Sequence, residues 1–463
     1  MNETKATKEL GDLDIKHLLH PYTNPRAHEQ VGPVIIERGE GIYVYDTNGQ
    51  RYLEALAGLW SVAVGFGEQR LVDAATRQMS MLPFYHLFAH KSHSPGIKLA
   101  EKLCAMAPGN LSHVLFSNSG SEANDSVVKL VWFYNNSIGR PQKKKFIARK
   151  SGYHGITVAS GSLTGLPANH NAFDLPKIPV THLECPHYYR FGNVGESEQQ
   201  FTDRLIKELE DTILAEGPDT IAAFIGEPVM GAGGVIVPPA GYWPRVEALC
   251  RKHDILLVLD EVITGFGRLG TMFAAEFYGV QPDMLVVSKQ ITSSYQPLAA
   301  VIFSEQIYQG IAEKAGSLGT FAHGLTAGGH PVATAVALEN LAIIEERGLV
   351  ANAREVGAYM RDKLGAFASH PMVGEVRGEG LIAAVELVAD KPSKRKFDPV
   401  GKVGGYLAGR GHALGLITRN LGDSIAFCPP MIITKAEVDL MLSLFAKALD
   451  ETYTWARNEG LAK

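Results

Sequence analysis

The stretch from Ile255 to Ile291 constrains the fold most, because it holds two apolar runs that each end in one charged residue. The run ILLVL ends at Asp260, and the run MLVVS ends at Lys289. Runs rich in Val, Ile and Leu are typical of strands buried on both faces of a parallel sheet. Since ligands of such sheets bind at the carboxyl ends of the strands, we expect this carboxylate and this amine to face one crevice.

The rest of the chain supports an α/β fold with two domains. From about residue 113 strand-like and helical segments alternate, which predicts βαβ units and a mainly parallel sheet. Asn48-Gly49 lies between two alternating segments and predicts a hairpin. After about residue 330 a long helix leads into short strands. We therefore expect a large domain over residues 76–335 and a smaller α+β domain built from residues 1–75 and 336–463.

Composition excludes several classes of function. With 463 residues and a net charge of -5, the chain is long enough for more than one lobe and has no basic excess for nucleic acid or an anionic membrane. No apolar run is long enough to span a bilayer. The four cysteines form no CxxC pair, and the start shows no signal-peptide pattern, so we expect a cytoplasmic protein.

Lys289 and Asp260 carry more information together than separately. A lone lysine at a strand end is usually solvated or ion-paired, and a lone aspartate there is usually a helix cap or an ion-pair partner. A lysine held in a pocket loses solvation, its pKa falls, and its amine can attack a carbonyl. Pyridoxal phosphate needs a lysine for its aldehyde carbon and an acid that keeps its ring nitrogen protonated. The pair therefore predicts a pyridoxal phosphate site.

A dinucleotide site is the competing interpretation of the same stretch. Residues 265–270, GFGRLG, match the pattern GxGxxG. In a dinucleotide fold the glycines follow the strand directly and the next strand ends in an acidic residue. Here residues 260–264 intervene and the next strand ends in Lys289, which disfavours that interpretation.

The segment SNSGSEAND, residues 117–125, is the candidate phosphate site. Gly120 and Ser121 lie between a predicted strand and a predicted helix, and backbone amides at a helix N-terminus bind phosphate well. The alternative is an ordinary helix cap, in which Ser121 with Asn124 or Asp125 satisfies the first turn.

Two further strand ends carry candidate side chains. Tyr153 could stack on a cofactor ring, whereas the neighbouring His154 is better explained as a packed or hydrogen-bonded residue. No second ligand lies at metal-binding spacing from His154, so no metal site is predicted. Glu227 ends a strand before several glycines, and it either orients groups near Asp260 or forms a structural ion pair.

Two candidates lie closer to the C-terminus. Thr326, among glycines, could bind a phosphate or could simply cap a turn. Arg419 could bind a substrate carboxylate through its planar guanidinium, although an arginine near a turn usually lies at the surface.

Six motifs in this order and spacing identify a family resemblance that covers essentially the whole chain. They are NSGSEAND, GYHG, GEPVMGAGG, LDEVITGFGRLG, SKQIT and HGLTAGGHPV. Together they resemble the class III pyridoxal phosphate aminotransferases of fold type I. The segments GLWSVAVGFG, LPFYHLF and GLITRNLGDSIAFCPPMIIT are most similar to ω-amino acid or amine:pyruvate transaminases. The resemblance implies a seven-stranded, mainly parallel sheet flanked by helices.

The resemblance also implies roles around the cofactor ring. Lys289 would be the Schiff-base lysine that also carries a proton, and Asp260 would pair with the pyridine nitrogen. Val262 would pack on one face of the ring and Tyr153 on the other. Glu227 would belong to the same cofactor-binding group.

Further roles implied by the resemblance concern the phosphate. Gly120 and Ser121 would hold it, and Thr326 would reach it from a neighbouring subunit. The resemblance thus implies a homodimer with shared active sites, with a tetramer as the alternative.

The substrate pocket is implied in the same way. Trp60, Phe88 and Tyr153 would shape it, with Phe88 contributed across the dimer interface. Arg419 would bind a carboxylate and move aside for a plain amine. Gln290 and Ala327-Gly328-Gly329 depart from the family pattern, where Gly or Ala follows the lysine and Tyr-Ser-Gly follows the threonine.

The predicted function is transfer of an amino group from a primary amine or ω-amino acid to an α-keto acid, pyruvate above all. The reaction would alternate between the pyridoxal and pyridoxamine forms of the cofactor. The alternatives are an enzyme specific for a diamine, β-alanine or taurine, and a non-catalytic binding protein with the same fold.

Overall fold

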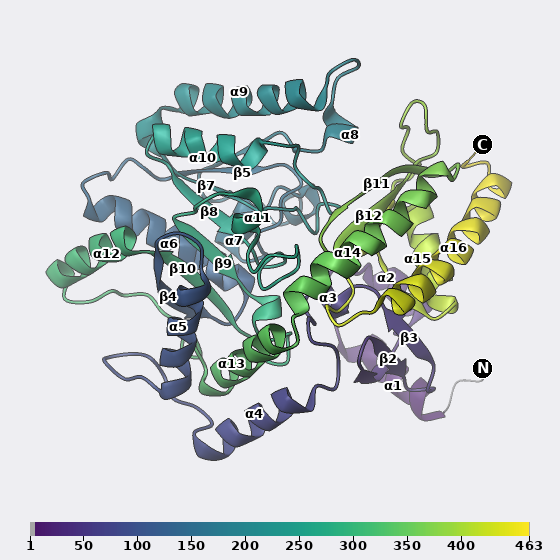
Figure 1. The fold of residues 1–463 in the computed structure, drawn as a ribbon, viewed down its shortest axis with the longest axis horizontal. Helices are drawn as coiled ribbons and strands as arrows, with labels where there is room; N and C mark the ends of the chain where they lie inside the picture. Colours follow the sequence, from purple (N-terminus) through teal and green to yellow (C-terminus); the bar gives the residue numbers. More distant parts are fainter. Residues whose placement is uncertain (1–4, 463) are drawn as a thin grey trace.

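The computed structural model describes residues 5–462 and places a seven-stranded sheet at its centre (Figure 1). The strand order is β4-β10-β9-β8-β7-β5-β6, and only β10 runs antiparallel to its neighbours. The predicted mainly parallel α/β fold is therefore confirmed. The strands are β4 (Leu111–Ser117), β5 (Lys145–Arg149), β6 (Val180–Leu183), β7 (Ile221–Gly226), β8 (Leu256–Asp260), β9 (Met284–Val287) and β10 (Ala299–Ser304).

Both faces of this sheet are covered, which explains the uninterrupted apolar runs. In β8, Leu257 and Leu259 join the core on one face, and Val258 joins the core on the other. The helices from the N-terminus through the large domain are α1 (Lys5–His17), α2 (Pro25–Val31), α3 (Ala57–Trp60), α4 (Gln69–Met81), α5 (Ser94–Met106), α6 (Gly120–Ser137), α7 (Val158–Leu163), α8 (Tyr188–Phe191), α9 (Glu198–Glu216), α10 (Tyr242–Lys252), α11 (Ala274–Tyr278), α12 (Glu305–Leu318) and α13 (Pro331–Glu346). The short 3₁₀ helices are η1 (Pro167–Asn169), η2 (Pro218–Thr220), η3 (Lys289–Ile291) and η4 (Ala366–Ser369).

Two smaller sheets join the ends of the chain. The hairpin at Asn48-Gly49 forms as predicted between β2 and β3, and β13 pairs in parallel with β3 at Leu416 opposite Leu53. The other small sheet is wholly antiparallel, in the order β11-β12-β15-β14. The strands are β1 (Ile36–Glu40), β2 (Tyr43–Asp46), β3 (Arg51–Glu54), β11 (Val373–Glu379), β12 (Ile382–Leu387), β13 (Leu416–Ile417), β14 (Arg419–Leu421) and β15 (Ser424–Phe427). The C-terminal helices are α14 (Leu349–Gly365), α15 (Lys402–Ala413) and α16 (Lys435–Asn458).

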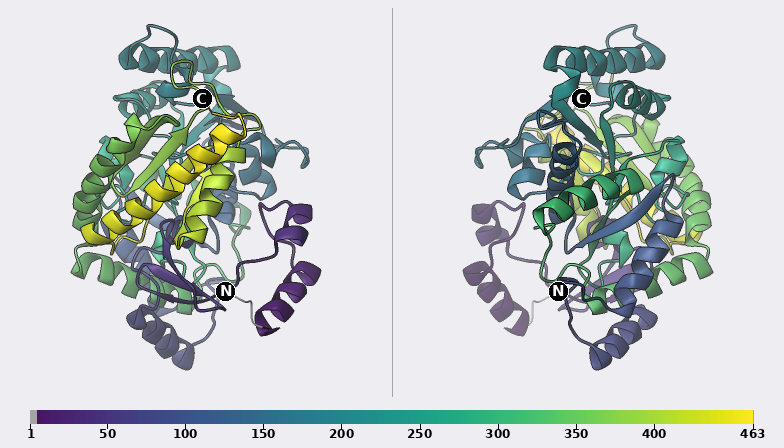
Figure 2. Two further views of the ribbon diagram at one scale, coloured as in Figure 1. Left: turned by 90° about the vertical axis from the view of Figure 1, so that its right-hand side faces the viewer. Right: turned by 90° about the vertical axis from the view of Figure 1, so that its left-hand side faces the viewer.

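The N-terminal helices α1 and α2 lie at the edge of the molecule, apart from the central layers (Figure 2). The predicted boundaries at residues 75 and 335 both fall inside helices, α4 and α13, which pack against each other. The predicted first segment also begins with residues 1–4, which lie outside the described part of the chain. A helix that crosses a predicted boundary connects the two parts rigidly.

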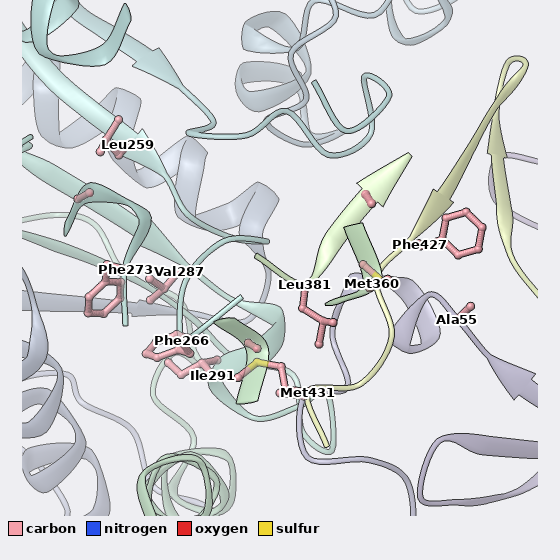
Figure 3. Packing of buried hydrophobic residues seen from close by; sticks show 14 of the residues in the cluster. Ala55, Leu259, Phe266, Phe273, Val287, Ile291, Met360, Leu381, Phe427 and Met431 are labelled. Carbon is pink, nitrogen blue, oxygen red and sulfur yellow. The ribbon is translucent and has the colours of Figure 1, made fainter. Parts of the chain in front are cut away.

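One apolar core extends from the large sheet into the smaller sheets (Figure 3). Leu259 and Val287 enter it from the large sheet, whereas Phe427 enters it from β15 and Leu381 from the turn between β11 and β12. All four cysteines are free thiols. Among residues 5–462, no helix combines the length and apolar character that crossing a bilayer requires.

Candidate active site

A cavity of about 350 Å³ opens at the carboxyl ends of β7, β8 and β9, where the strand pattern predicts a ligand crevice. Its volume is in the range of small-molecule sites. Seven of the predicted site residues line it: Gly120, Ser121, Tyr153, Glu227, Asp260, Val262 and Lys289. The fold thus brings together side chains that lie as far apart as residues 120 and 289.

Asp260 is held by three partners on the cavity wall. Its Oδ2 atom accepts hydrogen bonds from Asn124 Nδ2 and His154 Nδ1, both at 2.8 Å, and its Oδ1 atom accepts one from the Val262 amide at 3.2 Å. His154 is buried, and its hydrogen bond to Asp260 agrees with the interpretation as a hydrogen-bonded residue. Asn124 also donates to the carbonyl of His154 at 2.7 Å, so the three side chains form one network.

Sequence reasoning assigned no such role to Asn124 or His154. Asn124 was a candidate helix cap and His154 a packed residue, and neither pattern indicates a carboxylate partner more than 100 residues away. The position of both residues within recognised motifs was the available signal.

Lys289 opens the short helix η3 with a positive φ of 47°, a conformation that a lysine rarely adopts. Its amine makes no hydrogen bond or ion pair with the residues from 5 to 462. Burial lowers the pKa of Lys289, and the charge of Arg419 lowers it further, whereas Asp260 and Glu227 oppose these effects. The strained backbone and the desolvated amine together hold a nucleophile in the cavity.

The N-terminus of α6 forms the other end of the cavity. Ser119 is its cap, accepting a hydrogen bond from the Glu122 amide at 3.2 Å, so the alternative in which Ser121 caps this helix does not hold. The first amides of a helix have no intrahelical partner and are available to an anion. Ser121 Oγ instead accepts a hydrogen bond from the Ile156 amide at 3.2 Å.

Two glycines allow the chain segments at this end of the cavity to pack closely. A Cβ at Gly120 would meet Val262 Cγ2 at 3.2 Å, so a larger residue would press on Val262. Gly155 has a φ of 134°, and a Cβ there would lie 2.6 Å from Ser121 Oγ. Only glycine therefore permits the GYHG loop to approach the helix N-terminus so closely.

Glu227 orients the GYHG loop. Its Oε1 atom accepts the Tyr153 amide at 2.8 Å, and its Oε2 atom accepts the Gly231 amide at 3.0 Å. No ion pair of Glu227 occurs in the described part of the chain, so the ion-pair alternative is wrong there. Burial raises the pKa of Glu227, and the nearby Asp260 raises it further.

Tyr22 is a contact of Tyr153 that the sequence did not indicate. Burial raises the pKa of Tyr153 most, and a hydrogen bond with the Tyr22 side chain raises it further. The Tyr22 hydroxyl also accepts a hydrogen bond from Asn169 Nδ2 at 2.5 Å. The loop between α1 and α2 thus reaches the residues around the cavity.

The structure explains Gln290, which departs from the family pattern. Its side chain is fully buried and donates to the carbonyls of Ile263 at 2.7 Å and Gly265 at 2.8 Å. Its Oε1 atom accepts a hydrogen bond from Arg268 at 3.2 Å. Arg268 in turn donates to the carbonyls of Leu381 and Pro429 in the smaller domain. The side chain of Gln290 therefore joins the short helix that Lys289 opens to the GFGRLG turn.

Four predicted residues do not line this cavity. Trp60 is buried in a cluster that includes Ile263, a lining residue. Phe88 and Thr326 are exposed in the single chain. Phe88 lines a separate hollow. Arg419 begins β14 and acts on Lys289 through its charge.

The donor set of the cavity fits pyridoxal phosphate. The helix amides beside Gly120 and Ser121 suit a phosphate. Asp260 Oδ1 accepts one hydrogen bond, from a backbone amide, and suits a protonated ring nitrogen as a second donor. The unpaired amine of Lys289 suits an aldehyde. Tyr153 and Val262 supply the flat, apolar walls that a ring requires.

Comparison with known proteins agrees with this chemistry. The family model described as aminotransferase class-III matches residues 23–449. Gamma aminobutyrate transaminase 1 of Solanum lycopersicum, a mitochondrial protein, is 48% identical over 436 residues, which cover 94% of this chain and 85% of the relative. Vanillin aminotransferase of Capsicum annuum is 47% identical over 91% of this chain and 92% of its own length.

Solved structures show the same fold. The crystal structure of an omega transaminase from Pseudomonas jessenii in complex with PMP has a TM-score of 0.95 and is 59% identical. The match covers 96% of this chain and 98% of that chain.

Proposed function

Because the chain belongs to the class III aminotransferases, which depend on pyridoxal phosphate, we propose that it moves the amino group of a primary amine or ω-amino acid to an α-keto acid, pyruvate above all. The reaction has two halves, in which one product leaves before the second substrate binds. The observation that carries the proposal is that Lys289 and Asp260 face one cavity.

Each residue of the cavity has a distinct role in the proposal. Gly120 and Ser121 hold the phosphate through backbone amides and a hydroxyl. Tyr153 and Val262 hold the ring between them. Asp260 keeps the ring nitrogen protonated, and Glu227 sets the position of Tyr153 through its amide. When bound, pyridoxal phosphate withdraws electrons from the carbon that carries the amino group.

The fixed network around Asp260 favours a charged ring nitrogen. Asn124 and His154 both donate to Oδ2, which leaves Oδ1 directed toward one further donor besides the Val262 amide. Because these partners are buried and fixed, they need no reorganisation when charge develops.

Lys289 is the proposed proton carrier. The lowered pKa of Lys289 favours the neutral amine, which is the form that can accept a proton from a substrate carbon. The same amine can then return the proton to another atom in the cavity. This role requires the amine to stay close to both atoms, which the strained φ of Lys289 supports.

The similarity to omega transaminases supports an amine donor, and the similarity to gamma aminobutyrate transaminases supports an ω-amino acid. Arg419 could bind the carboxylate of an ω-amino acid or of a keto acid by a bidentate contact. A donor with a terminal carboxylate, such as an ω-amino acid of the β-alanine type, is therefore the second candidate, and a diamine or taurine is the alternative. We propose a homodimer in which Phe88 and Thr326 reach the partner's cavity, and a cytoplasmic location.

Spectroscopy of the holoenzyme tests this function. An amine donor added without acceptor should change the visible absorbance of the bound cofactor, and pyruvate should restore it. Lys289→Ala should still bind the cofactor but show no turnover, because the proton carrier is missing. Lys447→Ala, an exposed lysine on α16, is the matched control and should behave as the parent enzyme. Normal turnover in Lys289→Ala without added amine would refute the proposal.

A panel of donors and acceptors then separates the candidates. Faster reaction with gamma aminobutyrate than with a plain amine of equal length would favour the ω-amino acid. The reverse order would favour the amine, and an acceptor other than pyruvate giving the highest kcat/KM would remove pyruvate from the proposal.

A further inference from the structure

Three side chains converge at the outer edge of the molecule, away from the cavity. Asp14 Oδ1 lies 2.8 Å from His28 Nε2 and 3.0 Å from His20 Nε2. The two imidazole rings pack with their centroids 4.2 Å apart. The three ligand atoms all lie within 4.8 Å of one another. Asp14 comes from α1, His20 from the following loop and His28 from α2.

We propose that Asp14, His20 and His28 bind a divalent cation of the zinc class. Imidazole nitrogen and carboxylate oxygen are zinc ligands, with bonds of about 2.0–2.2 Å. Two ligands at such distances lie about 3.0 Å apart in an octahedral site and about 3.4 Å apart in a tetrahedral one. The separations of 2.8 Å and 3.0 Å between Asp14 and the two histidines are close to the octahedral value, and a tetrahedral site needs the ligand atoms to move apart by up to about 0.6 Å. A fourth position stays open to water.

Local structure holds the ligands in place before any ion arrives. Asn24 caps α2, accepting the amides of Arg26 at 3.0 Å and Ala27 at 3.2 Å, and Pro25 begins the helix. This cap fixes the turn between the two histidines. The side chains of Asp14 and His28 are only 16% and 13% exposed, so the site is partly shielded from water.

The charge of the site also suits a cation. The side chain of Asp14 is a carboxylate, which is ordinarily ionised at neutral pH. Neutral imidazoles and one carboxylate would give the ligand set a charge of about -1. A divalent ion of borderline softness is favoured over Mg²⁺ or Ca²⁺, which prefer oxygen ligands.

A second group, of one histidine and two carboxylates, differs from this site in its charge. His187, Glu375 and Glu386 also lie close together. There Arg377 forms ion pairs with both carboxylates, and Arg190 pairs with Glu386. The arginines already neutralise that group, whereas no arginine or lysine is paired with Asp14 in the described chain.

The proposed ion would act on the segment that carries Tyr22. This residue lies between His20 and His28, has a positive φ of 52° and contacts Tyr153 beside the cavity. An ion joining α1, the loop and α2 would restrain this segment, because three separate elements would share one centre. Sequence spacing did not indicate the site, since the ligands are 6 and 8 residues apart and match no metal motif.

Co²⁺ added alone to the metal-free holoenzyme tests the proposal, because its visible bands report nitrogen ligands. We expect bands that saturate at about one ion per chain and disappear when Zn²⁺ competes. Trypsin cleavage after Lys16 and Arg26, next to the site, should slow when the ion binds. The absence of saturable bands in the parent protein would overturn the site, and unchanged cleavage with bands present would overturn the restraint.

Two variants separate an ion site from a plain hydrogen-bonded pair. In His20→Gln the amide can still donate to Asp14 but is a poor zinc ligand, so the affinity for Zn²⁺ should fall by about 100-fold while the fold stays intact. The control is His17→Ala, which changes an exposed histidine at the end of α1, the helix that carries Asp14, and it should bind as the parent does. Equal affinity in His20→Gln and the parent protein would overturn the proposal.

Discussion

Gln290 offers the sharpest test of how this fold holds its candidate lysine. Its buried amide donates to the carbonyls of Ile263 and Gly265 and accepts from Arg268. The change Gln290→Met keeps a side chain of similar length but removes all three hydrogen bonds. The carbonyls of Ile263 and Gly265 and one guanidinium N–H of Arg268 then stay buried without their hydrogen-bond partner.

The size of the effect follows from these three groups. Leaving a buried polar group unsatisfied costs about 1–3 kcal/mol, and more when it is charged. Part of this cost is recovered because methionine is more favourably buried than glutamine and neighbouring groups adjust. We therefore expect the free energy of unfolding to fall by about 3–5 kcal/mol. Because Gln290 follows Lys289 directly, kcat should also fall, by up to about 100-fold.

Urea unfolding of the holoenzyme measures the first effect, at one protein concentration and one cofactor concentration, because both shift apparent stability. Initial rates at saturating substrates measure the second. Gln309→Met on α12 is the control, since Gln309 is exposed and its side chain donates to Glu305 at 2.6 Å. The reasoning is refuted if Gln290→Met lowers stability by less than about 1 kcal/mol and leaves kcat unchanged.

Three further variants probe the cofactor cavity and the proposed binding of a substrate carboxylate. Asn124→Ala removes one of two donors to Asp260 Oδ2, so the Kd for the cofactor should rise about tenfold, as equilibrium dialysis would show; an unchanged Kd contradicts the network. Gly155→Ala places a Cβ 2.6 Å from Ser121 Oγ at a φ of 134°, so calorimetry should show a lower Tm and the cofactor should bind more weakly. An unchanged Tm and an unchanged cofactor Kd would contradict the close approach of the loop to Ser121. Arg419→Ala should reduce kcat/KM for a keto acid by about tenfold or more and spare a plain amine; equal losses would exclude a role in carboxylate binding.

The fold was predictable because the burial of a strand or helix is reflected in the spacing of apolar residues along a short segment. A strand buried on both faces needs apolar residues at every position, and the run before Asp260 has them. The hairpin at Asn48-Gly49 was predictable because few residue pairs form such a turn. The domain boundaries stay predictions: the chosen positions lie inside α4 and α13, and no break in composition marks a boundary there.

The site was predictable only in part. Lys289 and Asp260 could be paired because parallel strands end at one edge of a sheet. The partners of Asp260 could not, because Asn124 lies 136 residues away and His154 106 residues away along the chain. Neither distance leaves a periodic signal.

By itself, the sequence determined the alternation of strands and helices from about residue 113 and the two charged residues at strand ends, because periodicity and turn chemistry depend on neighbours in the chain. Only the tertiary structure decided which side chains meet: Asn124 and His154 at Asp260, Gln290 at Arg268, and Tyr22 at Tyr153. A hydrogen bond requires two atoms at a set distance and angle. Whether two distant residues reach this geometry depends on how their segments pack, and the residue pattern of one segment alone does not indicate it.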